Sequence, residues 1–73
     1  MDDTKLMQSL RRAVAKRNAN RAGVRAWASV NCSLSEQKIL ARRFADLALS
    51  ADDHEVLRSI ARRVPIELRA VVL

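Results

Sequence analysis

The chain has 73 residues, of which 49% are hydrophobic and 30% charged, with a single glycine and a single proline. This length allows one small domain with a limited core and excludes an enzyme built on a large α/β scaffold. Because helix-breaking residues are scarce, we expect an all-α fold, a small single-domain bundle of four or five short helices over residues 1–73.

The charge is strongly basic and unevenly spread. Fourteen Lys and Arg against eight Asp and Glu give a net charge of +6. Residues 5–25 contain seven of these bases and no acid. Such a balance favours an acidic partner, which is nucleic acid, an acidic protein surface or anionic lipid.

Residues 3–17 are predicted to form the first helix. Thr4 and the two aspartates before it can cap its start and oppose the helix dipole. A stripe at helical spacing comprises Leu6, Leu10, Ala13, Val14 and Arg17, with Met7 beside it. Three bases lie away from this stripe, namely Arg11, Arg12 and Lys16. The stripe contains no Trp or Phe, which disfavours a membrane-surface helix.

The segment after the first helix contains turn-forming residues. Asn18, Asn20 and Gly23 predict a turn within residues 18–23. Residues 24–30 fit either a short helical face or a strand-like alternation. An isolated strand would have no partner in this chain, so the helix is the preferred of these two interpretations.

Two further helices are predicted at residues 34–49 and 51–63. Ser33 or Ser35 caps the first of these helices, and Ser33 with Glu36 has the spacing of a capping box. Ser50 caps the second helix. Acidic residues in the first turn and arginines later along that helix suit its dipole. The predicted inner faces comprise Leu40, Phe44, Leu47 and Ala48 in the first helix and Leu57, Ile60, Ala61 and Val64 in the second.

Residues 65–73 are predicted to form a last short helix. Pro65 ends the preceding helix and can start a new one. The expected inner face of this last helix comprises Ile66, Ala70 and Val71. The apolar C-terminus either packs into the core or docks on a partner, and packing is the preferred interpretation.

No residue pattern indicates catalysis or a metal site. His54 lies between Asp53 and Glu55, but neighbouring side chains on a helix point apart. Cys32 is the single cysteine, so it cannot form an internal disulfide, and we expect a half-buried apolar role. One Cys and one His give no metal-site spacing. We therefore expect a protein without enzymatic activity or cofactor.

The absence of a signal-peptide pattern and of a long apolar run predicts a cytoplasmic protein. The single cysteine agrees with a reducing compartment.

The arginine-rich stretch 11–25 is the most distinctive feature. It resembles the arginine-rich peptides of phage antiterminators, which bind hairpin RNA, and Trp27 could stack on a base, although a core position is the preferred interpretation. A DNA-reading helix-turn-helix at 34–63 is disfavoured because Asp52 and Asp53 would face phosphates.

The small size, the acidic start Asp2-Asp3, the basic stretch 11–25 and the short capped helices resemble small phage-encoded transcription regulators that bind host RNA polymerase. This resemblance implies stoichiometric binding to the transcription machinery in the cytoplasm of a bacterial host. Direct binding of DNA or hairpin RNA through residues 11–25 is the alternative. The candidate partner-binding residues are Arg11, Arg12, Lys16, Arg17, Arg21, Arg25, Arg42 and Arg43. The pattern leaves open the oligomeric state and whether the chain activates, inhibits or antiterminates.

Overall fold

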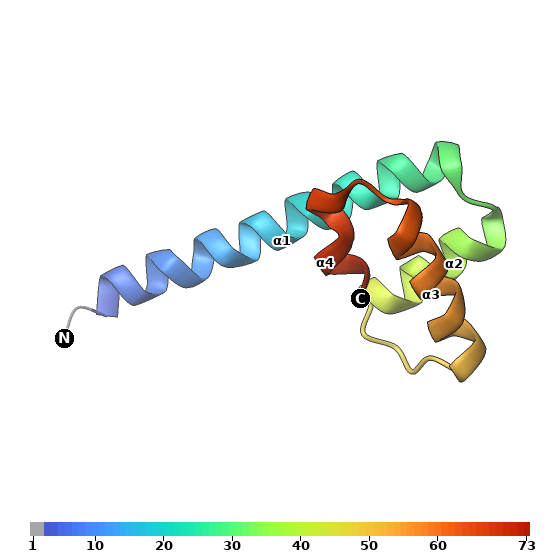
Figure 1. The fold of residues 1–73 in the computed structure, drawn as a ribbon. Helices are drawn as coiled ribbons and strands as arrows, with labels where there is room; N and C mark the ends of the chain where they lie inside the picture. The colour runs from blue at the N-terminus through green and yellow to red at the C-terminus, as the bar shows by residue number, and fades with distance from the viewer. Residues whose placement is uncertain (1–2) are drawn as a thin grey trace.

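The computed structural model describes residues 3–73, which form helices and connecting loops without any strand. In chain order the elements are α1 (Asp3–Asn31), α2 (Leu34–Phe44), α3 (Ala51–Arg63), the 3-10 turn η1 (Ile66–Leu68) and α4 (Arg69–Val72). The prediction of an all-α fold is confirmed (Figure 1).

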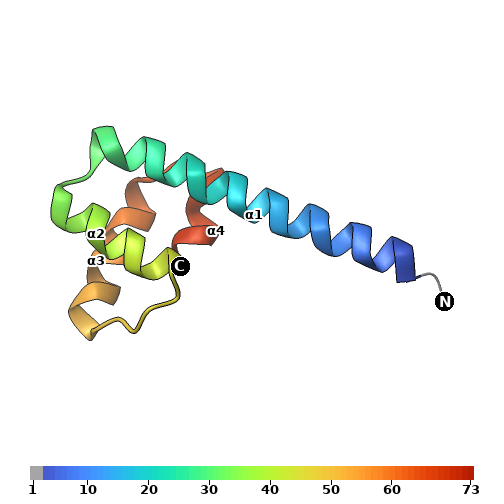
Figure 2. The ribbon, with the colours of Figure 1, turned by 180° about the vertical axis from the view of Figure 1, so that it is seen from behind.

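One helix is much longer than the others and gives the molecule its shape. α1 has 29 residues, so its axis is about 43 Å long, and the whole molecule measures 46 × 24 × 16 Å. The other helices gather around the C-terminal half of α1, and its N-terminal half extends away from them (Figures 1 and 2). We call residues 3–19 the projecting segment and residues 20–73 the helical body.

The predicted turn within residues 18–23 is wrong, because α1 continues through it to Asn31. Val24 and Ala28, on the inner face beyond the expected turn, are almost completely buried. Gly23 lies beside η1, where a Cβ atom would be 3.4 Å from Cδ2 of Leu68, an ordinary contact distance. This packing outweighs the roughly 1 kcal/mol by which glycine disfavours a helix. The helical interpretation of residues 24–30 is confirmed.

The core lies between the C-terminal half of α1 and the three later helices. Its buried residues are Val24, Ala28, Leu40, Phe44, Leu57, Ile60, Ala61, Val64 and Val72. The whole predicted inner face of α3 is therefore confirmed. Trp27 is partly buried and packs against this core, which agrees with the preferred interpretation of Trp27 as a core residue.

α2 ends at Phe44, five residues earlier than predicted. Asp46 has a φ of 56°, a left-handed conformation that stops the helix. The chain must then become extended at Ser50, the N-cap of α3, where φ is −76° and ψ is 169°. Leu47 is consequently 59% exposed and Ala48 is also exposed, so neither joins the inner face of α2.

Both predicted caps are present as complete capping boxes. The Ser33 hydroxyl accepts from the Glu36 amide at 3.2 Å, and the Ser33 amide donates to Oε1 of Glu36 at 2.9 Å. At α3, Ser50 and Asp53 make the equivalent pair of bonds, both 3.1 Å long. These bonds satisfy amide groups that have no partner inside the helix.

The C-terminus packs into the body, which confirms the preferred interpretation. Val72 is fully buried, and Leu68 packs against the core. The predicted inner face was nevertheless partly wrong, since Ile66 is 73% exposed and Ala70 is also exposed. The 3-10 turn after Pro65 rotates the following residues, so Leu68 and Val72 face inward instead.

Candidate partner-binding surface

The projecting segment carries a dense set of basic side chains away from the core. Every residue from 3 to 19 is exposed. The bases are Lys5, Arg11, Arg12, Lys16 and Arg17, and the one acid is Asp3, so the net charge of these residues is +4. Within the described chain, none of the five bases forms an ion pair. Asp3 lies in the first turn of α1, where the helix dipole favours it.

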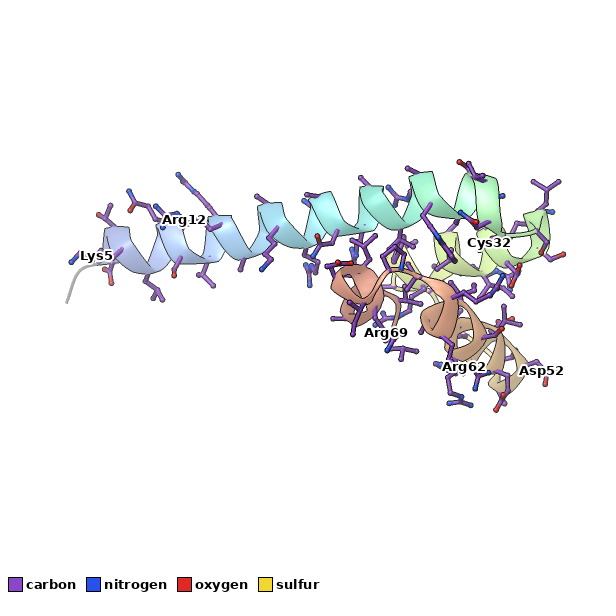
Figure 3. All side chains as sticks on the ribbon, turned by 45° about the horizontal axis from the view of Figure 1, so that its top comes forward. Lys5, Arg12, Cys32, Asp52, Arg62 and Arg69 are labelled. Atoms are coloured by element: carbon purple, nitrogen blue, oxygen red, sulfur yellow. The ribbon has the colours of Figure 1, made fainter. Side chains whose placement is uncertain are left out.

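Three of these bases share one side of the helix. At about 100° per residue, Arg12 and Lys16 return to within about 20° of the direction of Lys5. We call Lys5, Arg12 and Lys16 the basic ridge. Figure 3 shows Arg12 pointing away from the side of α1 on which the helical body lies. The basic ridge is therefore open to a partner along the whole projecting segment.

The opposite side of the projecting segment is apolar. Leu6, Met7, Leu10 and Val14 are 57%, 50%, 54% and 47% exposed. We call these four residues the apolar stripe. Leu10 and Val14 lie at helical spacing from Val24 and Ala28, so the stripe continues the inner face of α1 beyond the end of the body. Nothing in the described chain covers it.

Arg21 and Arg25 belong to the body. Both guanidinium carbons lie 5.3 Å from the centroid of the Phe44 ring. Nη1 of Arg21 also donates to the Phe44 carbonyl at 3.4 Å, while its Nε is buried without a partner. These cation–π contacts attach α1 to the end of α2. Arg21 is half-buried, whereas Arg25 remains exposed despite its contact with the ring.

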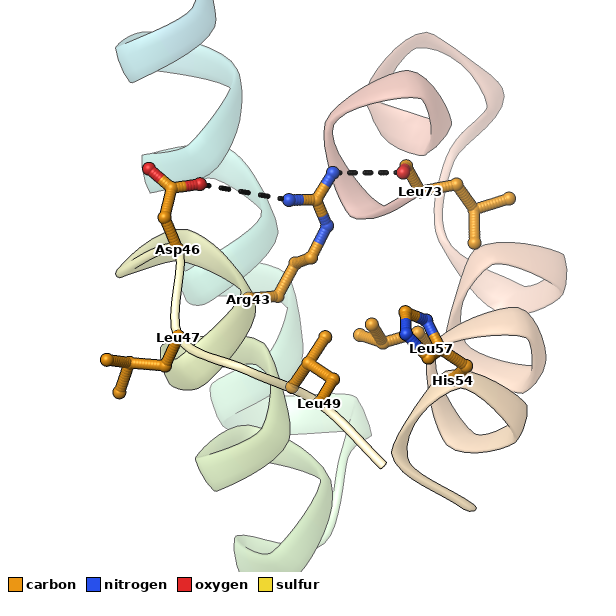
Figure 4. Close-up of a pocket in the computed structure, with 7 residues that line it drawn as sticks. All are labelled: Arg43, Asp46, Leu47, Leu49, His54, Leu57 and Leu73. Carbon is orange, nitrogen blue, oxygen red and sulfur yellow. Dashed lines mark hydrogen bonds and ion pairs between the residues drawn. The ribbon is translucent and has the colours of Figure 1, made fainter. Parts of the chain in front are cut away.

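Arg42 and Arg43 also have internal partners. Arg42 lies 3.7 Å from the Asp53 carboxylate at the start of α3. Arg43 lies 4.0 Å from Asp46 and donates to the Leu73 carbonyl at 2.9 Å, as Figure 4 shows. The eight predicted binding residues thus divide into four on the projecting segment and four with contacts inside the body.

Lys5 was missing from the predicted set. Its spacing of seven and eleven residues before Arg12 and Lys16 was the available signal, because those separations return to one side of a helix. All three bases lie within the helix predicted at residues 3–17, so the sequence already displayed this spacing.

The hollow next to Arg43 is lined by seven residues, of which four are leucines. Its lining includes His54, Leu49 and Leu57, and Arg43 at its edge is already paired (Figure 4). Cys32 is half-buried in a different part of the body. Burial and then the Glu36 carboxylate raise the pKa of its thiol, which disfavours the reactive thiolate.

The described residues also provide no cluster of three or more metal-binding side chains. In the same part of the chain, no helix combines the length and apolar character needed to cross a membrane. Comparison with protein-family models, curated proteins and solved structures found no match to the chain.

Proposed function

We propose that this protein is a small non-enzymatic transcription regulator that binds stoichiometrically to an acidic surface of RNA polymerase through the basic ridge. The observation that carries the proposal is the set of unpaired bases on a helix that extends beyond its own body. A regulator of this kind needs no catalytic group, only a surface whose charge and shape suit its partner.

The distribution of charge supports this role. The body has nine bases and six acids, and four of those acids are paired with arginines. The projecting segment extends for about 25 Å, several times the screening length of about 8 Å at physiological salt. Acids of the body therefore neutralise little of the potential along most of the basic ridge.

Two observations favour a protein partner over bare nucleic acid. Trp27 packs against the core and is partly buried, which reduces the ring surface available for stacking on a base. The first turn of α3 contains Asp52 and Asp53, and Asp53 is already used as a capping and ion-pairing group. As a recognition helix, α3 would direct acids at phosphates.

Direct binding of DNA or hairpin RNA is the second candidate. It is favoured by the run of exposed bases, which contains no acid between Lys5 and Arg17. For such binding, the slope of the logarithm of affinity against the logarithm of salt concentration should decrease by about one unit for each phosphate-contacting base removed.

The test is capture from a bacterial lysate with the tagged protein, with and without nuclease. The ridge variant combines Lys5→Ala, Arg12→Ala and Lys16→Ala. A matched control removes three exposed bases of the body, Lys38, Arg58 and Arg62, and so has the same net charge. We expect polymerase subunits to survive nuclease, to be lost from the ridge variant and to be retained by the control.

The other outcomes are equally informative. Loss of polymerase on nuclease treatment, or recovery of nucleic acid alone, would select the second candidate. Equal capture of polymerase by the ridge variant and the control would refute the assignment of the basic ridge.

A further inference from the structure

We propose that the apolar stripe is a dimer interface, on which the projecting segment of a second copy packs antiparallel about a two-fold axis at Leu10. This inference concerns the side of α1 opposite the basic ridge and does not depend on the proposed partner. The ridge would remain accessible in the dimer.

The stripe needs a cover that the described chain does not supply. Its four large side chains are each about half exposed, although they continue the helix face that buries Val24 and Ala28 in the same chain. Met7, Leu10 and Val14 follow the three- and four-residue spacing by which paired helices interlock. Side chains at this spacing suit a second helix better than solvent.

The register follows from charge. In an antiparallel pair centred on Leu10, the numbers of two residues that lie at the same level add up to 20, which is twice 10. Leu10 then faces the partner's Leu10, Leu6 lies at the level of the partner's Val14, and Asp3 lies at the level of the partner's Arg17. The last pair forms twice by symmetry, so the one acid of each segment meets a base on the seam of the other.

The remaining bases also fit this register. Lys5 lies at the level of the partner's Ala15, Arg12 at the level of the partner's Gln8, and Lys16 at the level of the partner's Thr4. No base therefore lies opposite a base. In a parallel pair in register, each base would face its own copy, and Arg17 would do so on the seam, which is unfavourable.

The shape of the molecule agrees with this arrangement. The stripe continues the face of α1 that buries Val24 and Ala28 against the body. The N-terminal half of α1 extends beyond the other helices (Figures 1 and 2). A second helix reaching from Asp3 to Arg17 therefore fills the length between the free end of α1 and the body. Each body would lie past the end of the other chain's helix.

The paired segments are only about 22 Å long, so the interface belongs to the small, reversible class. We expect sedimentation velocity to show monomers at about 1 μM and mostly dimers at a few hundred micromolar. Leu10→Asp should remain monomeric throughout, with unchanged helix content. The control Gln8→Asp, on the outer side of the same helix, should dimerise like the wild type.

Disulfide trapping tests the register. In a Cys32→Ser background, Leu10→Cys should cross-link to itself, whereas Gln8→Cys should not. Leu6→Cys and Val14→Cys should each fail alone but cross-link when mixed, because only the antiparallel pair brings these positions to one level. A parallel dimer would instead cross-link each of the two alone.

The proposal is overturned by a chain that stays monomeric at several hundred micromolar, or by a parallel pattern of cross-links. It is also overturned if Leu10→Asp abolishes capture of polymerase while the wild type is monomeric, since the stripe would then belong to that partner. Failure of the ridge variant to lose polymerase would leave the dimer result unaffected, so the two proposals fail separately.

Discussion

Gly23 lies next to Leu68 of the C-terminal 3-10 helix η1. The space beside its Cα is bounded by the two methyl groups of Leu68, at 3.4 and 3.5 Å from an ideal Cβ. These are ordinary contact distances, and the neighbouring atoms are the end of a flexible side chain. A methyl group therefore fits here, and anything larger must displace Leu68.

We predict that Gly23→Ala stabilises the protein by up to about 1 kcal/mol, because alanine has the higher helix propensity. Gly23→Leu should instead destabilise it by roughly 1–3 kcal/mol through overpacking. Chemical denaturation followed by circular dichroism measures both changes. Destabilisation by alanine would mean that Leu68 cannot move.

Glu36 connects the α2 cap to α3. Its carboxylate accepts from the Ser33 amide and pairs with Arg63. The Ser33 amide and then the Arg63 side chain lower the pKa of this carboxyl. Because the pKa is lower in the folded chain than in the unfolded chain, the contribution to stability is present above pH of about 4.3 and is lost as the pH falls through the folded value.

We predict that Glu36→Gln lowers the free energy of unfolding at pH 7. The variant should also lose less of this free energy than the wild type when the pH falls below about 5. The free energy of unfolding measured at a series of pH values between 7 and 3 tests this. Glu67→Gln is the control, because Glu67 has no ion pair within the described residues. If the free energy of unfolding of Glu36→Gln depended on pH as that of the wild type does, the stabilising role assigned to the Glu36 carboxylate would be contradicted.

Among the elements, α2 and α3 depend on their caps because both are short. They have 11 and 13 residues, a length at which an isolated helix is marginal in water. Each begins with a capping box and has two arginines in its last turn. The two helices therefore receive stabilisation at both ends before any tertiary contact forms.

We predict that Ser33→Ala and Ser50→Ala each destabilise the protein by about 1 kcal/mol, since each removes a cap acceptor. Ser35→Ala, two residues later in the first turn of α2 and without a capping bond, should change stability by less than about 0.5 kcal/mol. Thermal denaturation of the three variants compares them directly. Equal effects at positions 33 and 35 would show that the cap contributes little.

The whole molecule is divided between a packed body and a segment that contributes nothing to the core. Every buried core residue follows position 23. The projecting segment is helical because it continues a helix that the body already nucleates, and continuation costs less than nucleation. Stability and partner binding can therefore be separated along the chain.

We predict that a chain shortened to residues 18–73 keeps the unfolding midpoint of the full protein within a few degrees and loses its capture of polymerase. Removal of the segment deletes no core side chain, so the free energy of unfolding should change by less than about 1 kcal/mol. Calorimetry on both chains at a concentration of a few micromolar makes the comparison. Loss of cooperative unfolding would mean that the first half of α1 supports the body.

The local features of the fold could be predicted from the sequence. Ser33 with Glu36 and Ser50 with Asp53 determine two helix starts through short-range hydrogen bonds, and the spacing of Leu57, Ile60, Ala61 and Val64 determines the inner face of α3. Arg12 and Lys16 were identified as partner-binding candidates from charge alone, and that role is still a prediction. These properties depend on neighbours within about four residues, which a sequence displays directly.

The tertiary structure decided what lies in contact. Gly23 and the two asparagines before it have turn-forming propensities, yet α1 is continuous, and Val24 and Ala28 just beyond them are buried in the core. The body does not extend to Leu6, Leu10 and Val14, which are exposed, whereas Arg21 and Arg25 contact the ring of Phe44. An amphipathic pattern states which side of a helix prefers burial, but the distance to the rest of the chain determines whether that side is covered.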